Sequence, residues 1–399
     1  MLSHNAIPSW QPESISGILK AMNPLLNRRR FLKNSTTVAG LASLIGPGNC
    51  RIVSGQSAST IEWRFSLLGD LHFDHLDHHD FDWVKREHPG SVKQIENYSH
   101  ITESNLPGLM GRVKKTISTQ GCSSVVQIGD LVQGLCGNGK LARTHCEAAI
   151  DYFESLKLGV PVRVTKGNHD ITGPGAVEAY NELVVPWVAD GFDDMAFHDA
   201  HFLYKKGEDL FVYFDAYDPA SFDWFISLME ERPADSTGRV FFIVHPPVVP
   251  YNARSSWCLY GKEHHRDKRE RLYEILGKHQ AIVLCGHLHK YALVERETNE
   301  GSFTQLSVSS VANRIGGKAR DLISGVEQFG PDLVDLEPDH SPDTVKERRA
   351  ILSREKPFIR RFDYGAFWGH AVIKVTQEKV EADIYHQLDE EPWKTVRLA

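Results

Sequence analysis

The sequence predicts an α/β fold, and two of its features carry that prediction. After residue 60, short runs rich in Val, Ile, Leu and Phe recur, and each run ends abruptly in polar residues. Runs of this length and composition are typical of strands buried on both faces of a sheet. Amphipathic helical patterns separate the runs, and alternation of strands with helices indicates an α/β arrangement. With 399 residues, 41% of them hydrophobic, the chain can build one large core or two smaller ones.

The expected strands fall into two groups. Six buried runs occupy residues 63–70, 123–130, 160–168, 209–216, 239–246 and 281–289. Two later segments, residues 302–313 and 370–386, alternate more between apolar and polar side chains, and the second contains a turn-like Gln-Glu-Lys. We expect both later segments to be antiparallel additions to a sheet, because such alternation is typical of strands with one solvated face.

Helical patterns lie between these strands. The clearest occupies residues 141–158, where apolar side chains repeat at helical spacing along one stripe. The stripe consists of Ala142, Cys146, Ala149, Phe153 and Leu156. Further helices are expected at about residues 106–119, 222–231 and 266–278.

The segment from about residue 313 to 364 is long, charged and irregular, and we interpret it as an insertion before the final strands. One helix is expected within it, at residues 342–354. Its basic side chains could attract an anionic partner, but a solvated helix face is the favoured interpretation. These side chains are Lys346, Arg348, Arg349, Arg354, Lys356, Arg360 and Arg361.

Residues 1–60 are expected to be a twin-arginine export signal and a linker, and residues 61–399 to form the folded domain. Arg28 and Arg29 precede a weakly apolar stretch at residues 38–45, a pattern that resembles such signals. This stretch is much shorter than the roughly 20 residues of a membrane-spanning helix, so no permanent anchor is expected. The pattern predicts a periplasmic or secreted protein, and the alternative is a disordered basic tail on a cytoplasmic one.

Composition argues against several classes of protein. The net charge of −7 and the pI near 6.3 argue against a nucleic-acid binder held by bulk positive charge. The six cysteines contain no CxxC pair, which disfavours a zinc ribbon or a disulfide-dense scaffold. Cys146 and Cys285 lie in apolar segments, and we expect both to be small buried hydrophobic residues.

Side chains that can bind a metal or move a proton follow five of the six buried runs. In chain order they are Asp70, His72, Asp130, Asn168, His169, Asp170, His245, His287 and His289. In open α/β sheets, sites form beyond the carboxyl ends of the strands. One such residue alone is commonly a turn residue or a cap. Five strand ends that carry D-x-H, D, N-H-D, H and H-x-H instead indicate a metal site. The glycines before four of them suit sharp turns or close backbone approach.

With these motifs the chain resembles the calcineurin-like metallophosphoesterases, a superfamily of dinuclear metal-dependent phosphatases and phosphodiesterases. The resemblance extends over about residues 64–290. It rests on Asp-Leu-His at 70–72, Gly-Asp at 129–130, Gly-Asn-His-Asp at 167–170, His245 and Gly-His-Leu-His at 286–289. The resemblance implies a four-layer α/β/β/α sandwich of two mixed sheets, with a small phosphate ester as the substrate and two metal ions at the strand ends.

The resemblance also implies which residues hold the metals. Asp130 would bridge two ions about 3.5–4 Å apart, which need a shared carboxylate. Asp70, His72 and His289 would complete the ligands of the first ion. The second ion would take Asn168, His245 and His287. This mixed set of nitrogen and oxygen donors suits divalent Mn, Fe, Zn or Co.

The implied chemistry is hydrolysis by a metal-bridging hydroxide that attacks phosphorus in line, without a covalent intermediate. His169 would bind no metal and would either stabilise the phosphoryl oxygens or protonate the leaving oxygen. Asp170 would hold the His169 imidazole in the correct tautomer. The expected activity is that of a phosphodiesterase, with a phosphomonoesterase as the alternative and a non-catalytic scaffold as a more remote one.

Three further segments bear on the site. Residues 73–83 contain His75, His78 and His79, which could form a third metal site or contact the substrate, but an exposed loop is expected. Residues 246–268 could cover the site, with Arg254 meeting a phosphate oxygen, or could be an ordinary surface loop. Where purple acid phosphatases carry a tyrosine shortly after the second aspartate, this chain has Leu-Val-Gln at 131–133, so an iron–tyrosinate centre is not expected.

Overall fold

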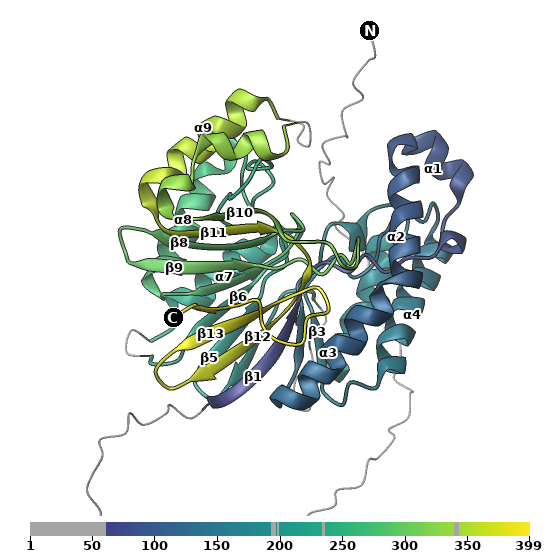
Figure 1. Ribbon diagram of the computed structural model, residues 1–399, viewed down its shortest axis with the longest axis horizontal. Helices are drawn as coiled ribbons and strands as arrows, with labels where there is room; N and C mark the ends of the chain where they lie inside the picture. Colours follow the sequence, from purple (N-terminus) through teal and green to yellow (C-terminus); the bar gives the residue numbers. More distant parts are fainter. Residues whose placement is uncertain (1–60, 193–196, 198, 234–235, 339–342) are drawn as a thin grey trace, which may run out of the picture. The chain divides into compact units, whose positions relative to one another are not determined.

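The computed structural model describes residues 61–192, 197, 199–233, 236–338 and 343–399. Its strands form two mixed β-sheets, which helices flank (Figure 1). The predicted export signal and linker lie outside the described residues. Within the described segments, no helix is both long enough and apolar enough to cross a membrane.

The first sheet has six strands in the order β14-β13-β12-β1-β2-β3. Their bounds are β1 Ile61–Leu68, β2 Val125–Gln127, β3 Val162–Val164, β12 Gly369–Thr376, β13 Val380–His386 and β14 Lys394–Arg397. The strands β1, β2 and β3 are parallel, and β12 joins β1 antiparallel. The antiparallel hairpin expected over residues 370–386 is confirmed as β12 and β13.

The second sheet has eight strands in the order β10-β11-β8-β9-β7-β6-β5-β4. Their bounds are β4 Phe202–Lys206, β5 Asp209–Tyr213, β6 Val240–Ile243, β7 Ile282–Cys285, β8 Tyr291–Glu297, β9 Ser302–Ser307, β10 Arg320–Ser324 and β11 Ile359–Ala366. The strands β5, β6, β7 and β9 run parallel to their neighbours in that series. The other pairs in this sheet are antiparallel.

The helices fall into two groups on either side of the sheets (Figure 1). Those encoded before β4 are α1 Phe81–Glu87, α2 Val92–Ser104, α3 Leu106–Gln120, α4 Gly139–Leu156, α5 Ala176–Ala179 and α6 Val185–Asp190. The later ones are α7 Ala220–Glu230, α8 Arg266–Lys278 and α9 Val345–Glu355. The expected helices at 106–119, 141–158, 222–231 and 266–278 therefore correspond to α3, α4, α7 and α8.

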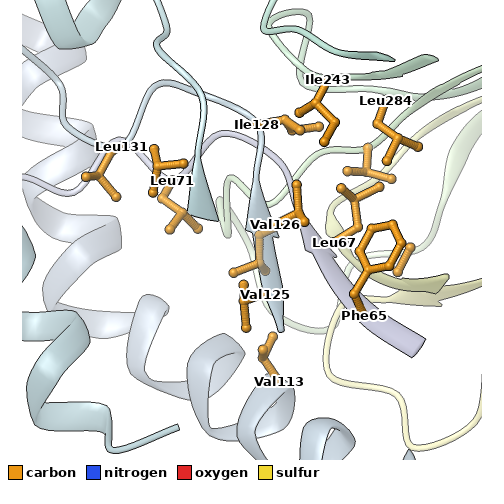
Figure 2. Close-up of a cluster of buried hydrophobic side chains, with 14 of the residues drawn as sticks. Phe65, Leu67, Leu71, Val113, Val125, Val126, Ile128, Leu131, Ile243 and Leu284 are labelled. Atoms are coloured by element: carbon orange, nitrogen blue, oxygen red, sulfur yellow. The ribbon is translucent and has the colours of Figure 1, made fainter. Parts of the chain in front are cut away.

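Side chains of the second sheet alternate between two cores. In β5, Phe211 and Tyr213 belong to the cluster shared with the first sheet and with α3 and α4. Leu210 and Val212 belong to the cluster that contains residues of α7 and α8. In the first sheet, Phe65 of β1 contacts Phe211 and Phe241 of the second sheet, whereas Val113 of α3 lies beside Val125 of β2 (Figure 2). The layers are thus helix, sheet, sheet and helix, as predicted.

The orientation expected for residues 302–313 is partly wrong. The strand β9 is antiparallel to β8 but parallel to β7, so it lies inside the sheet. Two of its polar residues, Gln305 and Ser307, are buried, whereas Ser302 and Thr304 are partly exposed. Gln305 is buried, and its side chain accepts hydrogen bonds from the N–H groups of Val248 and Val249 (2.8 and 2.9 Å). The sequence does not distinguish a polar side chain that hydrogen-bonds to a buried loop from one that faces water.

The segment 313–364 is more regular than expected. It contributes β10 and β11, and β11 pairs with β8 over the length of the strand. The expected helix is α9, which begins with a capping box formed by Thr344 and Glu347. Not all of its basic residues are solvated, because Arg348 is buried and donates hydrogen bonds to the carbonyl oxygens of Ala253 and Pro338.

Candidate metal centre

The predicted site residues all lie just beyond the carboxyl ends of five strands. Residues 70 and 72 follow β1, residue 130 follows β2, and residues 168–170 follow β3. His245 follows β6, and residues 287 and 289 follow β7. Four of these residues have a left-handed backbone, with φ of 49° at His72, 52° at Asp130, 70° at His287 and 52° at His289. A positive φ is uncommon for residues other than glycine and is found most often at functional sites. The backbone at these turns therefore sets the direction of the ligand side chains.

The first cluster contains Asp70, His72, Asp130 and His289. Their ligand atoms all lie within 4.8 Å of one another. His289 Nε2 is 2.9 Å from Asp70 Oδ2 and 2.9 Å from His72 Nε2. His72 Nε2 is in turn 3.7 Å from Asp130 Oδ2.

The second cluster contains Asp130, His245 and His287, with Asn168 beside them. His245 Nε2 lies 3.2 Å from Asp130 Oδ2 and 3.1 Å from Asn168 Oδ1. It also lies 3.1 Å from His287 Nδ1. Asp130 belongs to both clusters, and the structure brings the seven residues together in the two sets that the family resemblance implied.

The hydrogen bonds of two imidazoles test whether cations fit here. His245 Nδ1 donates to the carbonyl oxygen of Ile128 (2.8 Å), and His72 Nδ1 donates to Gln133 Oε1 (2.9 Å). Each Nε2 atom therefore presents a lone pair. These lone pairs face carboxylate and amide oxygens, which are also acceptors. Acceptors that converge in a buried space suit a cation, and the imidazole N–H bonded to a second partner is the usual arrangement of a metal-binding histidine.

The electrostatics of the site also favour cations. Burial would lower the pKa of His245, but the Asp130 and Asp70 carboxylates outweigh burial and raise that pKa to about 9. Burial would raise the pKa of Asp130, but the charges on His245 and His169 hold it well below its usual value. Without a metal, the carboxylates thus attract a proton to the position that a cation would take. The residues fit a dinuclear divalent metal centre.

His169 belongs to neither cluster but lies beside them. Its backbone N–H donates to Asp130 Oδ1 (2.8 Å), and its ring centroid is 4.6 Å from that of His72. Its Nδ1 donates to the carbonyl oxygen of Gln133 (2.8 Å). This bond fixes the tautomer of the ring and leaves Nε2 to hold or release a proton.

The expected contact between Asp170 and the His169 ring is wrong. Asp170 Oδ1 accepts from the N–H of Val132 (3.0 Å), and Oδ2 accepts from the N–H of Gly167 (2.8 Å). Residues 169–171 form a helical turn, so consecutive side chains point in different directions. Burial, followed by the charge on Asp130, raises the pKa of Asp170 to about 7. Asp170 therefore connects the loops after β2 and β3. The carbonyl oxygen of Gln133 takes the role expected of Asp170, because it holds the His169 ring in one tautomer.

The histidine-rich segment 73–83 is only partly the exposed loop that we expected, because residues 76 and 77 are exposed but two of its histidines are not. His78 and His79 are only 5% and 7% exposed. Asp74 Oδ1 accepts from His79 Nε2 (2.7 Å), and Asp74 Oδ2 accepts from the Ser99 hydroxyl (3.0 Å). Asp74, His78 and His79 are buried beside Ser99 of α2 and His145 of α4, and neither partner is adjacent to them in sequence.

The same segment contributes to a third group of possible ligands, formed by Asp74, His78 and His145. His145 Nε2 donates to the carbonyl oxygen of Phe73 (2.7 Å), and its Nδ1 lies 3.2 Å from Cys136 Sγ. Asp74 and His145 thus have hydrogen-bond partners within the described residues. We interpret this group as a network that holds the loop after β1 in place.

Sequence reasoning missed two neighbours of the clusters, Tyr98 and Gln133, whereas Trp257 lies in the segment 246–268 that was expected to cover the site or to be a surface loop. Tyr98 of α2 stacks on His72, with centroids 4.2 Å apart and an interplanar angle of 10°. Gln133 binds both His72 and His169, and its position directly after the second motif was the only signal that could have identified it. Trp257 lies 5.7 Å from the ring of His287. Arg254 faces Glu337 at 3.5 Å, so it already has a carboxylate partner.

Similar solved structures include a dimetal phosphatase from Danio rerio, at 12% identity and a TM-score of 0.49, with coverage of 85% of this chain and 100% of that one. Another is the purple acid phosphatase PPD1 from yellow lupin (Lupinus luteus), at 11% identity and a TM-score of 0.49. It is matched over 85% of this chain and 54% of its own, so this chain spans about half its length. A search of curated proteins by sequence gave no match.

The match to a family model is more extensive. The model for calcineurin-like phosphoesterases matches residues 64–291, which is more than half of the chain. The matched region runs from β1 to the start of β8 and includes every residue of the two clusters. The chain belongs to the calcineurin-like phosphoesterase family and is a metal-dependent hydrolase of phosphoric ester bonds.

Proposed function

We propose that the protein hydrolyses phosphodiesters with the help of two divalent cations held at the strand ends. The observation that carries this proposal is the position of Asp130, whose carboxylate is shared by two clusters of ligand atoms. One cation would take Asp70, His72 and His289, and the other would take Asn168, His245 and His287. The donor set suits Mn, Fe, Zn or Co.

When bound, the two cations would supply positive charge at the phosphoryl oxygens and would lower the pKa of a coordinated water. The chain itself contributes orientation and a proton. His72 and His245 are held by Nδ1 bonds that aim each Nε2 into the site. His169 has its Nδ1 fixed by a carbonyl oxygen, so its Nε2 can protonate the leaving oxygen.

Metal-dependent turnover tests the proposal directly. Protein stripped of metal is supplied with Mn, Fe, Zn or Co in turn and assayed on bis(4-nitrophenyl) phosphate, a cyclic nucleotide and 4-nitrophenyl phosphate. We expect diester hydrolysis with at least one metal, and Asp130→Ala to lose both metal and turnover. Asp332→Ala, which removes an exposed carboxylate, is the matched control. Hydrolysis of the monoester alone would show that the protein is a phosphomonoesterase.

The role of His169 can be tested through the leaving group. Nitrophenolate leaves without a proton, whereas an alkoxide needs one. His169→Ala should therefore slow hydrolysis of alkyl esters by about 10²–10⁴-fold and nitrophenyl esters much less. His100→Ala removes an exposed histidine and serves as the control. An equal loss on both ester types would assign His169 to stabilising the phosphoryl oxygens instead.

We further propose export through the twin-arginine route, which rests on Arg28, Arg29 and the apolar stretch that follows. Exchange of both arginines for lysine should retain the protein in the cytoplasm when its location is followed by cell fractionation. Unchanged export of that variant would contradict the proposal.

A further inference from the structure

A cavity of about 400 Å³ adjoins the metal centre. His289, a member of the first cluster, forms part of its lining. The cavity therefore borders the first cluster, where a phosphate ester would bind. Its size lies in the range of pockets that hold small organic ligands.

The lining of this cavity, which we call the basic cavity, is strongly cationic. Lys290, Arg314, Lys318 and Arg320 all contribute, and none of the lining residues is a carboxylate. Lys290 is neutralised by Glu337 at 2.7 Å. The other three are exposed and form no ion pair with any described residue. Three unpaired cations in a chain of net charge −7 give this concave region a local positive field.

The wall that carries these cations is held in place by buried side chains. Gln387 is buried, accepts a hydrogen bond from the N–H of Gly316 (2.7 Å) and donates one to the carbonyl oxygen of Gly317 (2.6 Å). Trp368 Nε1 donates to the carbonyl oxygen of Arg314 (3.2 Å). These bonds fix the loop 313–318, which carries Arg314 and Lys318, to residues that flank β12 and β13, and Arg320 follows as the first residue of β10.

Another part of the lining of the basic cavity is aromatic. Phe367 and Trp368 are both among its lining residues. Phe367 is half-buried and stacks on Tyr291, with centroids 5.5 Å apart. Phe367 is the partly exposed aromatic side chain of this wall, and it can contact a ring, as in pockets that combine aromatic contact with a few polar groups.

We propose that the basic cavity binds the organic group of the substrate, and that this group carries a ring and a second phosphate. The inference rests on the proposed function, because it takes the scissile phosphate to lie at the metal centre. A phosphate is favoured over a single carboxylate because its double charge suits three unpaired cations, two of them arginines. The substrate class is therefore a nucleotide-like diester with a phosphate beyond the bond that is cut.

Two substrates that differ by one group test this. The 4-nitrophenyl ester of thymidine 5′-phosphate is compared with the same ester that carries an additional 3′-phosphate, and nitrophenol release is followed. We expect the wild type to have a KM about tenfold lower for the ester with the 3′-phosphate. The double variant Lys318→Ala/Arg320→Ala should lose this preference, because its KM for the ester with the 3′-phosphate should rise to its KM for the simpler ester.

The control is Lys85→Ala/Arg86→Ala, which removes two exposed cations from α1 and should leave the preference intact. Binding of thymidine 3′,5′-bisphosphate and of thymidine 5′-phosphate, measured by calorimetry, separates this inference from the proposed function. If no ester is cleaved but the bisphosphate binds about tenfold more tightly and loses that advantage in Lys318→Ala/Arg320→Ala, only the proposed function fails. Equal affinity of the wild type for both nucleotides would overturn the inference.

Discussion

At the scale of single residues, Asp130 connects the parts of the site. Its Oδ2 lies within 3.7 Å of His72 Nε2 and 3.2 Å of His245 Nε2. Its Oδ1 accepts from the backbone N–H of His169 (2.8 Å). The same carboxylate thus contacts both ligand clusters and positions His169, the proposed acid. A substitution of Asp130 should therefore affect the binding of both cations and the position of His169 together.

A histidine far from the clusters gives a pH prediction for stability. Burial, followed by the charge on Arg112, lowers the pKa of His370 to about 3. In the unfolded chain His370 takes up a proton near its usual value of about 6.5, so stability decreases as pH falls below that value. At pH 5 the protonation of His370 in the unfolded chain should lower the free energy of unfolding by about 2 kcal/mol.

His370→Gln should remove that part of the acid sensitivity. The measurement is the free energy of unfolding by denaturant at pH 7 and pH 5 for both proteins. We expect the wild type to lose more stability than His370→Gln over this interval. Equal losses would mean that His370 is protonated in the native state, despite its stacking on Tyr385 at 4.5 Å.

At the scale of elements, the turns after the strands are packed against one another. A Cβ on Gly167 would lie 2.1 Å from the backbone nitrogen of Asp130, and one on Gly286 would lie 2.2 Å from Asp70 Oδ1. A Cβ on Gly129 would lie 2.5 Å from His245 Nδ1, and Gly129 also has a positive φ of 88°. Glycine is required at these turns because each one presses against a ligand from another strand.

Gly167→Ala should therefore displace Asp130 and lower activity by about 10²-fold or more, because small misplacements at a site are costly. Metal content after dialysis should decrease with it. Gly90→Ala is the matched control, since a Cβ there meets nothing within 4 Å. Full activity in Gly167→Ala would show that the loop after β3 can move without consequence.

The sequence allowed prediction of the elements whose signals are local. The buried runs and the polar residues that follow them are contiguous, so the strands before Asp70, Asp130 and His245 could be placed. The partners of His79 and Asp170 could not be predicted, because they depend on how distant segments pack. The strands β10 and β11 were missed for the same reason: β11 is defined by its pairing with β8, which lies more than 60 residues earlier.

At the scale of the whole molecule, the two clusters draw on both sheets. Asp70, His72, Asp130 and Asn168 follow strands of the first sheet, whereas His245, His287 and His289 follow strands of the second. Each cluster contains members from both. Cations bound here would therefore join the sheets at the edge where the strands end.

Metal removal should consequently destabilise the fold. Binding at a free concentration of 100 times Kd stabilises a protein by about 2.7 kcal/mol per site. We expect chelation to lower the Tm of the wild type and to leave that of Asp130→Ala unchanged. Elemental analysis should find two ions per chain, and a third ion would contradict the interpretation of the Asp74 group as a hydrogen-bonded network.

The division of ligands between the sheets has a consequence for biosynthesis. The donor atoms extend from position 70 to position 289, so a nascent chain cannot hold either ion until nearly three quarters of it has been made. Neither sheet by itself carries a complete set of donors. Both metal ions can accordingly bind only after the two sheets have docked. A chain whose sheets have not yet docked is unable to retain its metal.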